Sequence, residues 1–184
     1  MLLNQLQNYL TTVQYPGEKL SGLRILSFLD RVALPFHRET LEGHITASAF
    51  IVSFDHHKVA LLHHAKLNKW LQPGGHCDGN PDTWAVAQKE AQEETGISHF
   101  ISQNEIWDVD VHWIPARKDV PGHWHYDIRY LLQTQEGEET LRGNEESHAV
   151  KWVLGEELPL FTQESSIHRM WQKLRDKNMS SNRT

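Results

Sequence analysis

Apolar positions recur along the chain with two different periods, which predict helices at both ends and strands between them. Residues 1–13 carry apolar side chains every three or four positions, the spacing of an amphipathic helix. A second helix is expected from Ser21 to about Leu34, because serine is a favourable N-cap residue. Its inward face is expected to carry Leu23, Leu26, Leu29 and Val32. The same pattern predicts a final helix over about 163–177.

Between these helices the period changes to two, which is typical of half-buried strands. The predicted strands cover residues 44–52, 59–62, 106–114, 125–132 and 149–154. One more helix is expected over 81–95, since Pro81 suits a helix start and Gly96 suits a helix end. Strands before, between and after helices predict an α/β fold with a mixed sheet.

The predicted helix at 81–95 carries the most informative side chains of the chain. A glycine pair and a loop lead into it, and Glu90, Glu93 and Glu94 follow at positions i, i+3 and i+4. A helix advances about 100° per residue, so these three carboxylates share one face and repel one another. A hard divalent cation such as Mg²⁺ relieves that repulsion, because it prefers oxygen ligands. The spacing favours a metal site over the alternative, a solvated acidic helix face.

This segment resembles the Nudix box, G-x5-E-x7-R-E-U-x-E-E-x-G-U, in which U is aliphatic. Counted from Gly75, the E-x-x-E-E-x-G core is intact and ends at Gly96. Two positions depart, because Pro81 replaces the first Glu and Lys89 replaces the Arg. The resemblance implies a Nudix-type α/β/α sandwich with a mixed sheet. It also implies two parts, an N-terminal helical extension at 1–42 and a Nudix hydrolase domain at 43–184.

The same resemblance implies a metal-dependent pyrophosphohydrolase that uses Mg²⁺ or Mn²⁺. Its substrate would be a nucleoside diphosphate linked to another moiety or a related small molecule. The family pattern makes metal ligands of the carboxylates of Glu90, Glu93 and Glu94 and of the Gly74 carbonyl. Glu90 is alternatively the general base, which would take a proton from the attacking water.

Two further catalytic roles follow from the family pattern. Lys89 would replace the arginine that orients the glutamates, although lysine lacks the bidentate guanidinium fork. Because Pro81 removes the acid that usually pairs with that arginine, the two replacements look coupled, and weakened support of an intact site is expected. Glu146, with Glu145 beside it, lies where many members place an extra ligand or base, and a solvated loop acid is the alternative.

Candidate substrate-binding residues lie outside the box. Strand alternation places His125, Asp127 and Arg129 on one face, where Arg129 would contact phosphate and His125 a base or a proton. A salt bridge on the sheet face, between Asp127 and the neighbours of Arg129, is the alternative. Trp70 is expected either to stack on a base or to pack in the core.

Other polar clusters carry weaker signals. Asp108, Asp110 and His112 also alternate, which predicts a solvent-facing strand surface, with a metal site as the alternative. The chain has 13 histidines, including the pairs at 56–57 and 63–64 and the alternating pair at 123 and 125. Structural zinc sites combine cysteines and histidines at fixed spacing, and this chain has a single cysteine. No zinc site is therefore expected from the sequence.

Composition narrows the class of partner to small molecules. The net charge of −6 gives no general basic field for a nucleic acid polymer. No apolar run approaches the roughly 20 residues of a membrane helix, and no signal peptide is recognised. Cys77 alone excludes an internal disulfide, so a cytoplasmic location is expected. The helical front at 1–42 would pack on the core, cover the site or make a homodimer contact.

Three other functions compete with the leading one. The first is a catalytically weak nucleotide-binding or sensor protein on the same fold, motivated by Pro81 and Lys89. The second is a nucleoside triphosphate pyrophosphohydrolase, because the box binds the diphosphate that all such substrates share. The third is an isopentenyl diphosphate isomerase, which expects its cysteine upstream of the box, whereas Cys77 lies inside the box loop.

Overall fold

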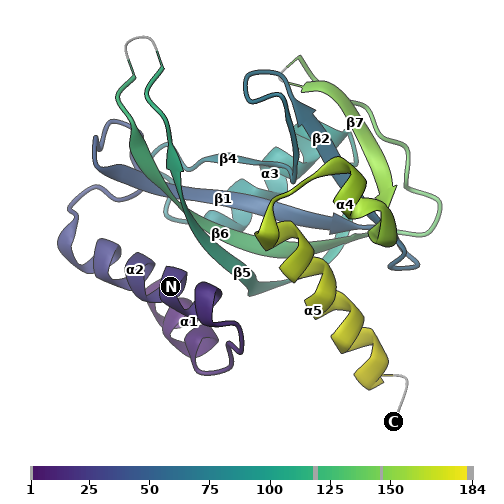
Figure 1. Cartoon of the computed structure of the whole chain (residues 1–184), viewed down its shortest axis with the longest axis horizontal. Coiled ribbons are helices and arrows are strands. Elements are labelled where there is room, and N and C mark those ends of the chain that lie inside the picture. The colour runs from purple at the N-terminus through teal and green to yellow at the C-terminus, as the bar shows by residue number, and fades with distance from the viewer. Residues whose placement is uncertain (1, 118–119, 146, 182–184) are drawn as a thin grey trace. The chain divides into compact units, whose positions relative to one another are not determined.

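A computed structural model describes residues 2–117, 120–145 and 147–181 (Figure 1). The helices are α1 (Leu2–Leu10), α2 (Pro16–Arg31), α3 (Thr83–Thr95), α4 (Leu158–Phe161) and α5 (Ser165–Ser181), with a 3-10 turn η1 (Gly155–Glu157) before α4. The strands are β1 (Gly43–Val52), β2 (Lys58–His64), β3 (Lys69–Leu71), β4 (Gly74–His76), β5 (Phe100–Ile114), β6 (His123–Thr134) and β7 (Ser147–Leu154). Of the described helices, none has the length and apolar character needed to cross a membrane.

The described strands form one seven-stranded sheet in the order β3-β2-β1-β6-β5, while β4 pairs with β1 and β7 pairs with β2. The predicted α/β fold with a mixed sheet is therefore confirmed. The chain divides into two compact units that each draw on distant parts of the sequence. The first unit comprises Met1–Ser48, Gly74–Gln88 and Asn104–Tyr130, and the second comprises Ala49–Pro73, Lys89–Gln103 and Leu131–Thr184.

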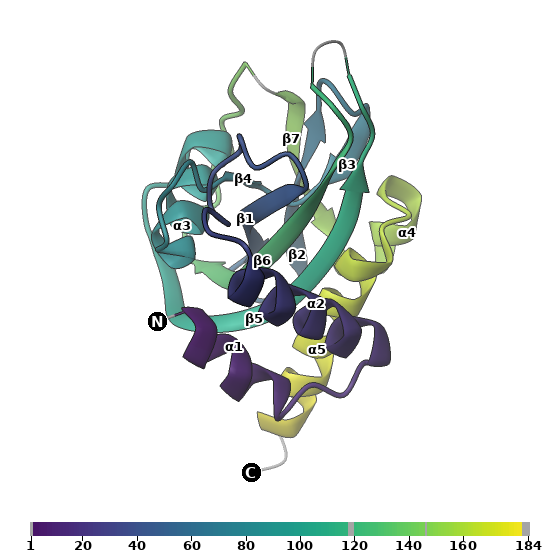
Figure 2. The same cartoon turned by 90° about the vertical axis from the view of Figure 1, so that its left-hand side faces the viewer.

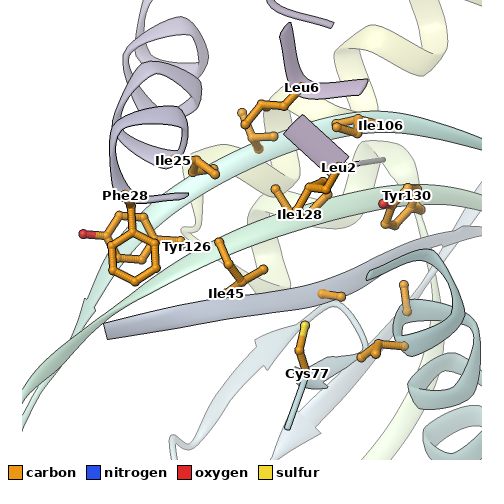
Figure 3. Packing of buried hydrophobic residues seen from close by; sticks show 14 residues of the cluster. Leu2, Leu6, Ile25, Phe28, Ile45, Cys77, Ile106, Tyr126, Ile128 and Tyr130 are labelled. Carbon is orange, nitrogen blue, oxygen red and sulfur yellow. The ribbon is translucent and has the colours of Figure 1, made fainter. Parts of the chain in front are cut away.

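The N-terminal helices contribute to the hydrophobic core of the first unit (Figure 3). Leu6, Ile25 and Phe28 have no exposed surface and join the cluster that contains Ile128 of β6. The ring of Phe28 stacks on that of Tyr126, with centroids 4.0 Å apart and 13° between the ring planes. Figure 2 shows α1 and α2 beside β5. Residues 2–31 therefore bury apolar surface with the sheet, and a domain boundary at residue 42 stays a prediction.

Helix α2 differs from its prediction at its start. It begins at Pro16, five residues before the expected cap Ser21. Proline is favoured in the first turn of a helix, because its missing N–H has no intrahelical partner there and its φ is already near the helical value. The expected serine cap was wrong because Pro16, and not Ser21, begins the helix.

The buried face of α2 agrees with its prediction in part, because Leu26, Leu29 and Val32 pack against the core cluster as expected and Leu23 does not. Leu23 is 51% exposed, whereas Ile25 and Phe28 are fully buried. A Cβ at Gly22 would lie 2.4 Å from a methyl carbon of Leu10 in α1. The two helices therefore approach closely at this glycine.

In the second unit β2 pairs with β3 and β7 (Figure 1), in addition to its pairing with β1 at Val52 and Val59. The pairings with β3 and β7 are antiparallel, and the β2–β7 register is interrupted between His63 and His64. Register places Trp70 of β3 opposite His63. The loop before β7 reaches the end of α3, because the Arg142 N–H donates to the Thr95 carbonyl at 2.7 Å.

Candidate functional site

Both ends of α3 are fixed by local hydrogen bonds. Asp82 caps the start, since its Oδ1 accepts a hydrogen bond from the Ala85 N–H at 3.0 Å. Gly96 follows the last helical residue with φ +73°, and its N–H donates to the Gln92 carbonyl at 2.9 Å. This left-handed conformation favours glycine at a helix end. The last two turns, which carry the glutamates, are thereby held in helical geometry.

The three glutamates differ in exposure along their shared face. Glu94 is buried with 5% exposure, the side chain of Glu90 is 19% exposed and that of Glu93 is 54% exposed. Lys89 Nζ lies 3.1 Å from Glu93 Oε2 and 3.7 Å from Glu90 Oε1. The hydrogen bond to Glu93, together with the charge of Glu90, raises the pKa of Lys89.

The charges of these four side chains do not balance. Three carboxylates and one ammonium group leave two negative charges in excess. Two of the three carboxylates, those of Glu94 and Glu90, are largely or fully shielded from water. Carboxylate oxygens are the ligands that Mg²⁺ and Mn²⁺ prefer. The donor chemistry of this helix face therefore fits the divalent ion that the family pattern implies.

The acidic pair predicted beside this site is only partly described. Glu145 is exposed in the turn before β7, and Glu146 lies outside the described residues. The hydrogen bond from Arg142 to Thr95 holds this loop at the end of α3, within the second unit. The role of Glu146 as a ligand or base stays a prediction.

Gly74 begins β4 in the first unit and lies opposite Ser48 of β1. A Cβ at Gly74 would lie 2.4 Å from Ser48 Oγ, 2.7 Å from Ser48 Cα and 2.8 Å from the Ala47 carbonyl oxygen. The last two of these are backbone atoms of the paired strand and cannot turn away. Only glycine allows β4 to pair with β1 at this distance. A role for its carbonyl as a metal ligand stays a prediction.

Arg129 lies in a buried ion-pair network on the sheet face of the first unit. It is 3% exposed, and its Nε donates to Asp127 Oδ2 at 2.7 Å. Asp127 also accepts hydrogen bonds from the hydroxyls of Thr46 at 2.9 Å and Ser48 at 2.8 Å. These contacts match the salt-bridge alternative for Arg129. Binding of phosphate by Arg129 stays a prediction, and the contacts of its guanidinium do not support it.

The neighbouring strand β5 adds two more carboxylates to this network. Arg129 lies 3.5 Å from Asp108 and 3.2 Å from Asp110. Burial lowers the pKa of Arg129, but the charges of Asp127, Asp110 and Asp108 outweigh it, so the pKa is raised. Asp108 is fully buried, so the predicted solvent-facing surface is wrong at this position. The reason is the pairing of β5 next to β6, which turns the polar face of β5 toward Arg129.

His125 belongs to a group of five histidines on the same sheet face of the first unit. The group consists of His44, His76, His112, His123 and His125, with ring centroids 4.9 to 5.5 Å apart in each contacting pair. Burial and the neighbouring histidines lower the pKa of His125 to about 2 and that of His44 to about 4. Both rings are therefore neutral at physiological pH.

Trp70 packs in the second unit on three sides. Its ring stacks on His63 at 5.0 Å, meets Phe161 edge-on at 5.5 Å and lies 5.7 Å from Lys151 Nζ. Trp70 is half-buried among these neighbours and is not one of the buried core residues. Stacking of Trp70 on a substrate base stays a prediction.

A surface hollow in the second unit is unsuited to an anionic substrate. Its volume is about 630 Å³. Its lining comprises Phe54, Asp55, Glu136, Gly137, Glu139 and Thr140. The three carboxylates among these residues would repel a diphosphate, so the hollow is not considered further as a substrate site.

With this geometry in place, comparison with known proteins is decisive for the family. The family model of the NUDIX domain matches residues 43–174. The chain belongs to the Nudix hydrolase family. A curated relative from Lactococcus lactis subsp. cremoris, named "Probable DHNTP pyrophosphohydrolase", is 31% identical over 99 residues. That match covers 53% of this chain and 58% of the relative, so the chain spans little more than half the length of that protein.

Solved structures show the same Nudix fold. A C. elegans Ap4A hydrolase in a binary complex superposes with a TM-score of 0.55 at 16% identity, covering 74% of this chain and 98% of that one. The E. coli dihydroneopterin triphosphate pyrophosphohydrolase superposes with a TM-score of 0.53 at 15% identity, covering 72% and 95%. At these identities the likeness establishes the fold alone.

In this Nudix chain the two departures from the box occupy different surroundings. Pro81 is exposed just before α3, and the cap of that helix comes from the next residue, Asp82. Lys89 contacts two of the three box glutamates from within α3. Lys89 thus contacts the glutamates of α3, although Pro81 stands where the Nudix box has its first glutamate.

Proposed function

We propose that this protein is a metal-dependent pyrophosphohydrolase that cleaves the diphosphate linkage of a small molecule. The observation that carries the proposal is the face of α3 that holds Glu90, Glu93 and Glu94, where Lys89 contacts Glu90 and Glu93. Membership of the Nudix family supports it, because the intact part of the box is the part that contains these glutamates.

The side chains of this face would have different roles in metal binding, which follow from their exposure. Glu94, which is buried, and Glu90, which is largely buried, offer oxygens in fixed positions, and Glu93 offers an exposed one. Lys89 is a positioning residue, since it holds Glu93 and Glu90 by charge. A bound Mg²⁺ or Mn²⁺ would offset the charge that builds on the diphosphate oxygens during attack by water. Glu90 would accept the proton of that water when it is not a ligand.

Two substrate classes fit this site. The first is a nucleoside diphosphate linked to another moiety, as the family pattern implies. The second is a triphosphate, which the name of the Lactococcus lactis relative favours. Glutamates on a helix bind the shared diphosphate through the metal and do not read the rest of the molecule. A substrate panel therefore has to include both classes.

The test is hydrolysis by the purified full chain with Mg²⁺ or Mn²⁺ over such a panel, with product phosphates quantified. Glu93→Gln removes one metal-binding charge while keeping the side-chain size, and Glu138→Gln makes the same change at an exposed loop position. We expect turnover of one class, a loss of about 10²-fold or more in Glu93→Gln, and wild-type turnover in Glu138→Gln.

Equal activity of Glu93→Gln and the wild type would overturn the metal role of this helix face. A chain that binds the panel compounds but turns over none of them is the nucleotide-binding or sensor protein. In that case Pro81 and Lys89 become the positions to restore first.

A further inference from the structure

Three of the clustered histidines are arranged as metal ligands rather than as ordinary packed rings. His44 lies on β1, and His123 and His125 lie on β6, the strand next to it. One ring nitrogen from each of these three side chains lies within 4.8 Å of those of the other two. Imidazole nitrogens that converge over such a distance from paired strands present a common space to a single ion.

Hydrogen bonding leaves lone pairs in that space. His123 Nδ1 lies 2.9 Å from the Pro121 carbonyl oxygen, which can only accept, so this nitrogen carries the proton. In the neutral ring the Nε2 of His123 then holds a lone pair, and it accepts a hydrogen bond from Nε2 of His125 at 3.2 Å. An ion bound in that space would replace this hydrogen bond. A carbonyl that fixes one nitrogen while the other binds metal is the usual arrangement around protein metal ions.

His44 is the most unusual member of the group. It is 2% exposed, and neither of its ring nitrogens has a hydrogen-bond partner. The backbone of Thr40 lies near enough to favour the charged form of the ring, but it does not form a hydrogen bond with either ring nitrogen. A buried polar atom without a partner costs about 1–3 kcal/mol. A ligand in the space between the three rings would remove that cost.

We propose that His44, His123 and His125 bind a divalent transition-metal ion of the zinc class. Three neutral imidazoles suit Zn²⁺ and its neighbours, whereas Mg²⁺ prefers the carboxylate oxygens of α3. The site is independent of the activity proposed above.

Two adjoining histidines extend the site. The rings of His76 and His112 lie 5.1 and 5.5 Å from that of His125. His112 Nδ1 lies 3.2 Å from Asp110 Oδ2, a carboxylate contact of the kind that orients metal-binding histidines. A water or one of these rings would complete the four positions that zinc prefers.

The experiment uses the full chain without a histidine tag, stripped of metal and then held in excess Mg²⁺ so that the carboxylate site is occupied. Co²⁺ is added as a spectroscopic probe, and Zn²⁺ is then added to displace it. We expect a visible d–d absorption that saturates at one Co²⁺ per chain and is abolished by one Zn²⁺. His44→Gln and His125→Gln should lose the band, whereas His99→Gln, at an exposed position, and Glu93→Gln should keep it.

X-ray absorption of the zinc-loaded wild type keeps the proposal testable if a variant fails to fold. The proposal expects Zn–N distances of about 2.0–2.1 Å with the multiple scattering of imidazole. It is overturned if Zn²⁺ does not bind, if the first shell contains oxygen only, or if Glu93→Gln loses the Co²⁺ band while His125→Gln keeps it.

Discussion

Phe28 joins α2 to the core of the first unit, and truncating this side chain tests whether the N-terminal helices are integral to the fold. Phe28 is fully buried and stacks on Tyr126 at 4.0 Å. Phe28→Ala removes a buried ring and leaves a cavity, which costs about 3–5 kcal/mol in protein cores. Loss of the aromatic stack accounts for about 0.5–1.5 kcal/mol of such a change. We therefore expect Phe28→Ala to lower the free energy of unfolding by about 4 kcal/mol, the middle of that range.

Thermal and urea unfolding measure this loss directly. For a chain of 150–250 residues, 1 kcal/mol shifts Tm by about 2–4 °C, so Phe28→Ala should lower Tm by roughly 8–16 °C. Leu20→Ala is the matched control, because Leu20 lies on the same helix and is 61% exposed. Its free energy of unfolding should stay within about 0.5 kcal/mol of the wild type.

A free energy of unfolding for Phe28→Ala within about 1 kcal/mol of the wild-type value would contradict this expectation, because truncating a buried aromatic side chain costs more than that. That result would mean that α2 does not share a core with the sheet in solution. Deletion of residues 1–38 would then leave a soluble folded protein. If Phe28 is a core residue, the same deletion exposes apolar surface, and aggregation is expected instead.

Three other changes test separate parts of the structure. Gly74→Ala should lower the free energy of unfolding by about 1–3 kcal/mol and reduce turnover, because the new Cβ would clash with the backbone of β1. Urea unfolding measures the first effect, and the substrate panel measures the second. In metal-free protein the pKa of His44 is lowered from 6.5 to about 4, so the unfolded chain protonates first as pH falls. The stability from this residue is complete above about pH 6.5 and falls by about 1.4 kcal/mol per pH unit toward pH 4, and His44→Asn should flatten that slope in denaturant titrations. Pro81→Glu combined with Lys89→Arg should raise the metal-dependent rate if the two departures are coupled, and an unchanged rate would count against coupling.

Helix α3 was predictable because all of its determinants are local. The helical spacing of the glutamates, the glycine after them and the polar residue before them act within a few positions of one another. The structure places the helix at Thr83–Thr95, with Asp82 at its start and Gly96 at its end. The predicted start at Pro81 is two residues early, which is the usual uncertainty of a helix boundary.

The histidine group was not predictable from motif spacing, because its members come from four strands. Each strand showed its polar face through a period of two, but the period says nothing about which strands pair. Only the order β1-β6-β5 brings His44, His125 and His112 onto one surface. The signal available in the sequence was weaker: polar residues alternate in three predicted strands whose other faces are apolar. The same missing information led to the wrong solvent face at Asp108.

The two donor sets determine how metal dependence has to be measured in this chain. Carboxylates on α3 match Mg²⁺ or Mn²⁺, and imidazoles on the sheet face of the first unit match zinc-class ions. EDTA would remove both, so loss of activity with EDTA alone would not assign the catalytic ion to the glutamates. Adding back Mg²⁺ without zinc, and zinc without Mg²⁺, separates the two. If Mg²⁺ alone restores turnover in His125→Gln as well as in the wild type, the glutamates carry the chemistry. A requirement for zinc that His125→Gln abolishes would instead link the histidines to the reaction.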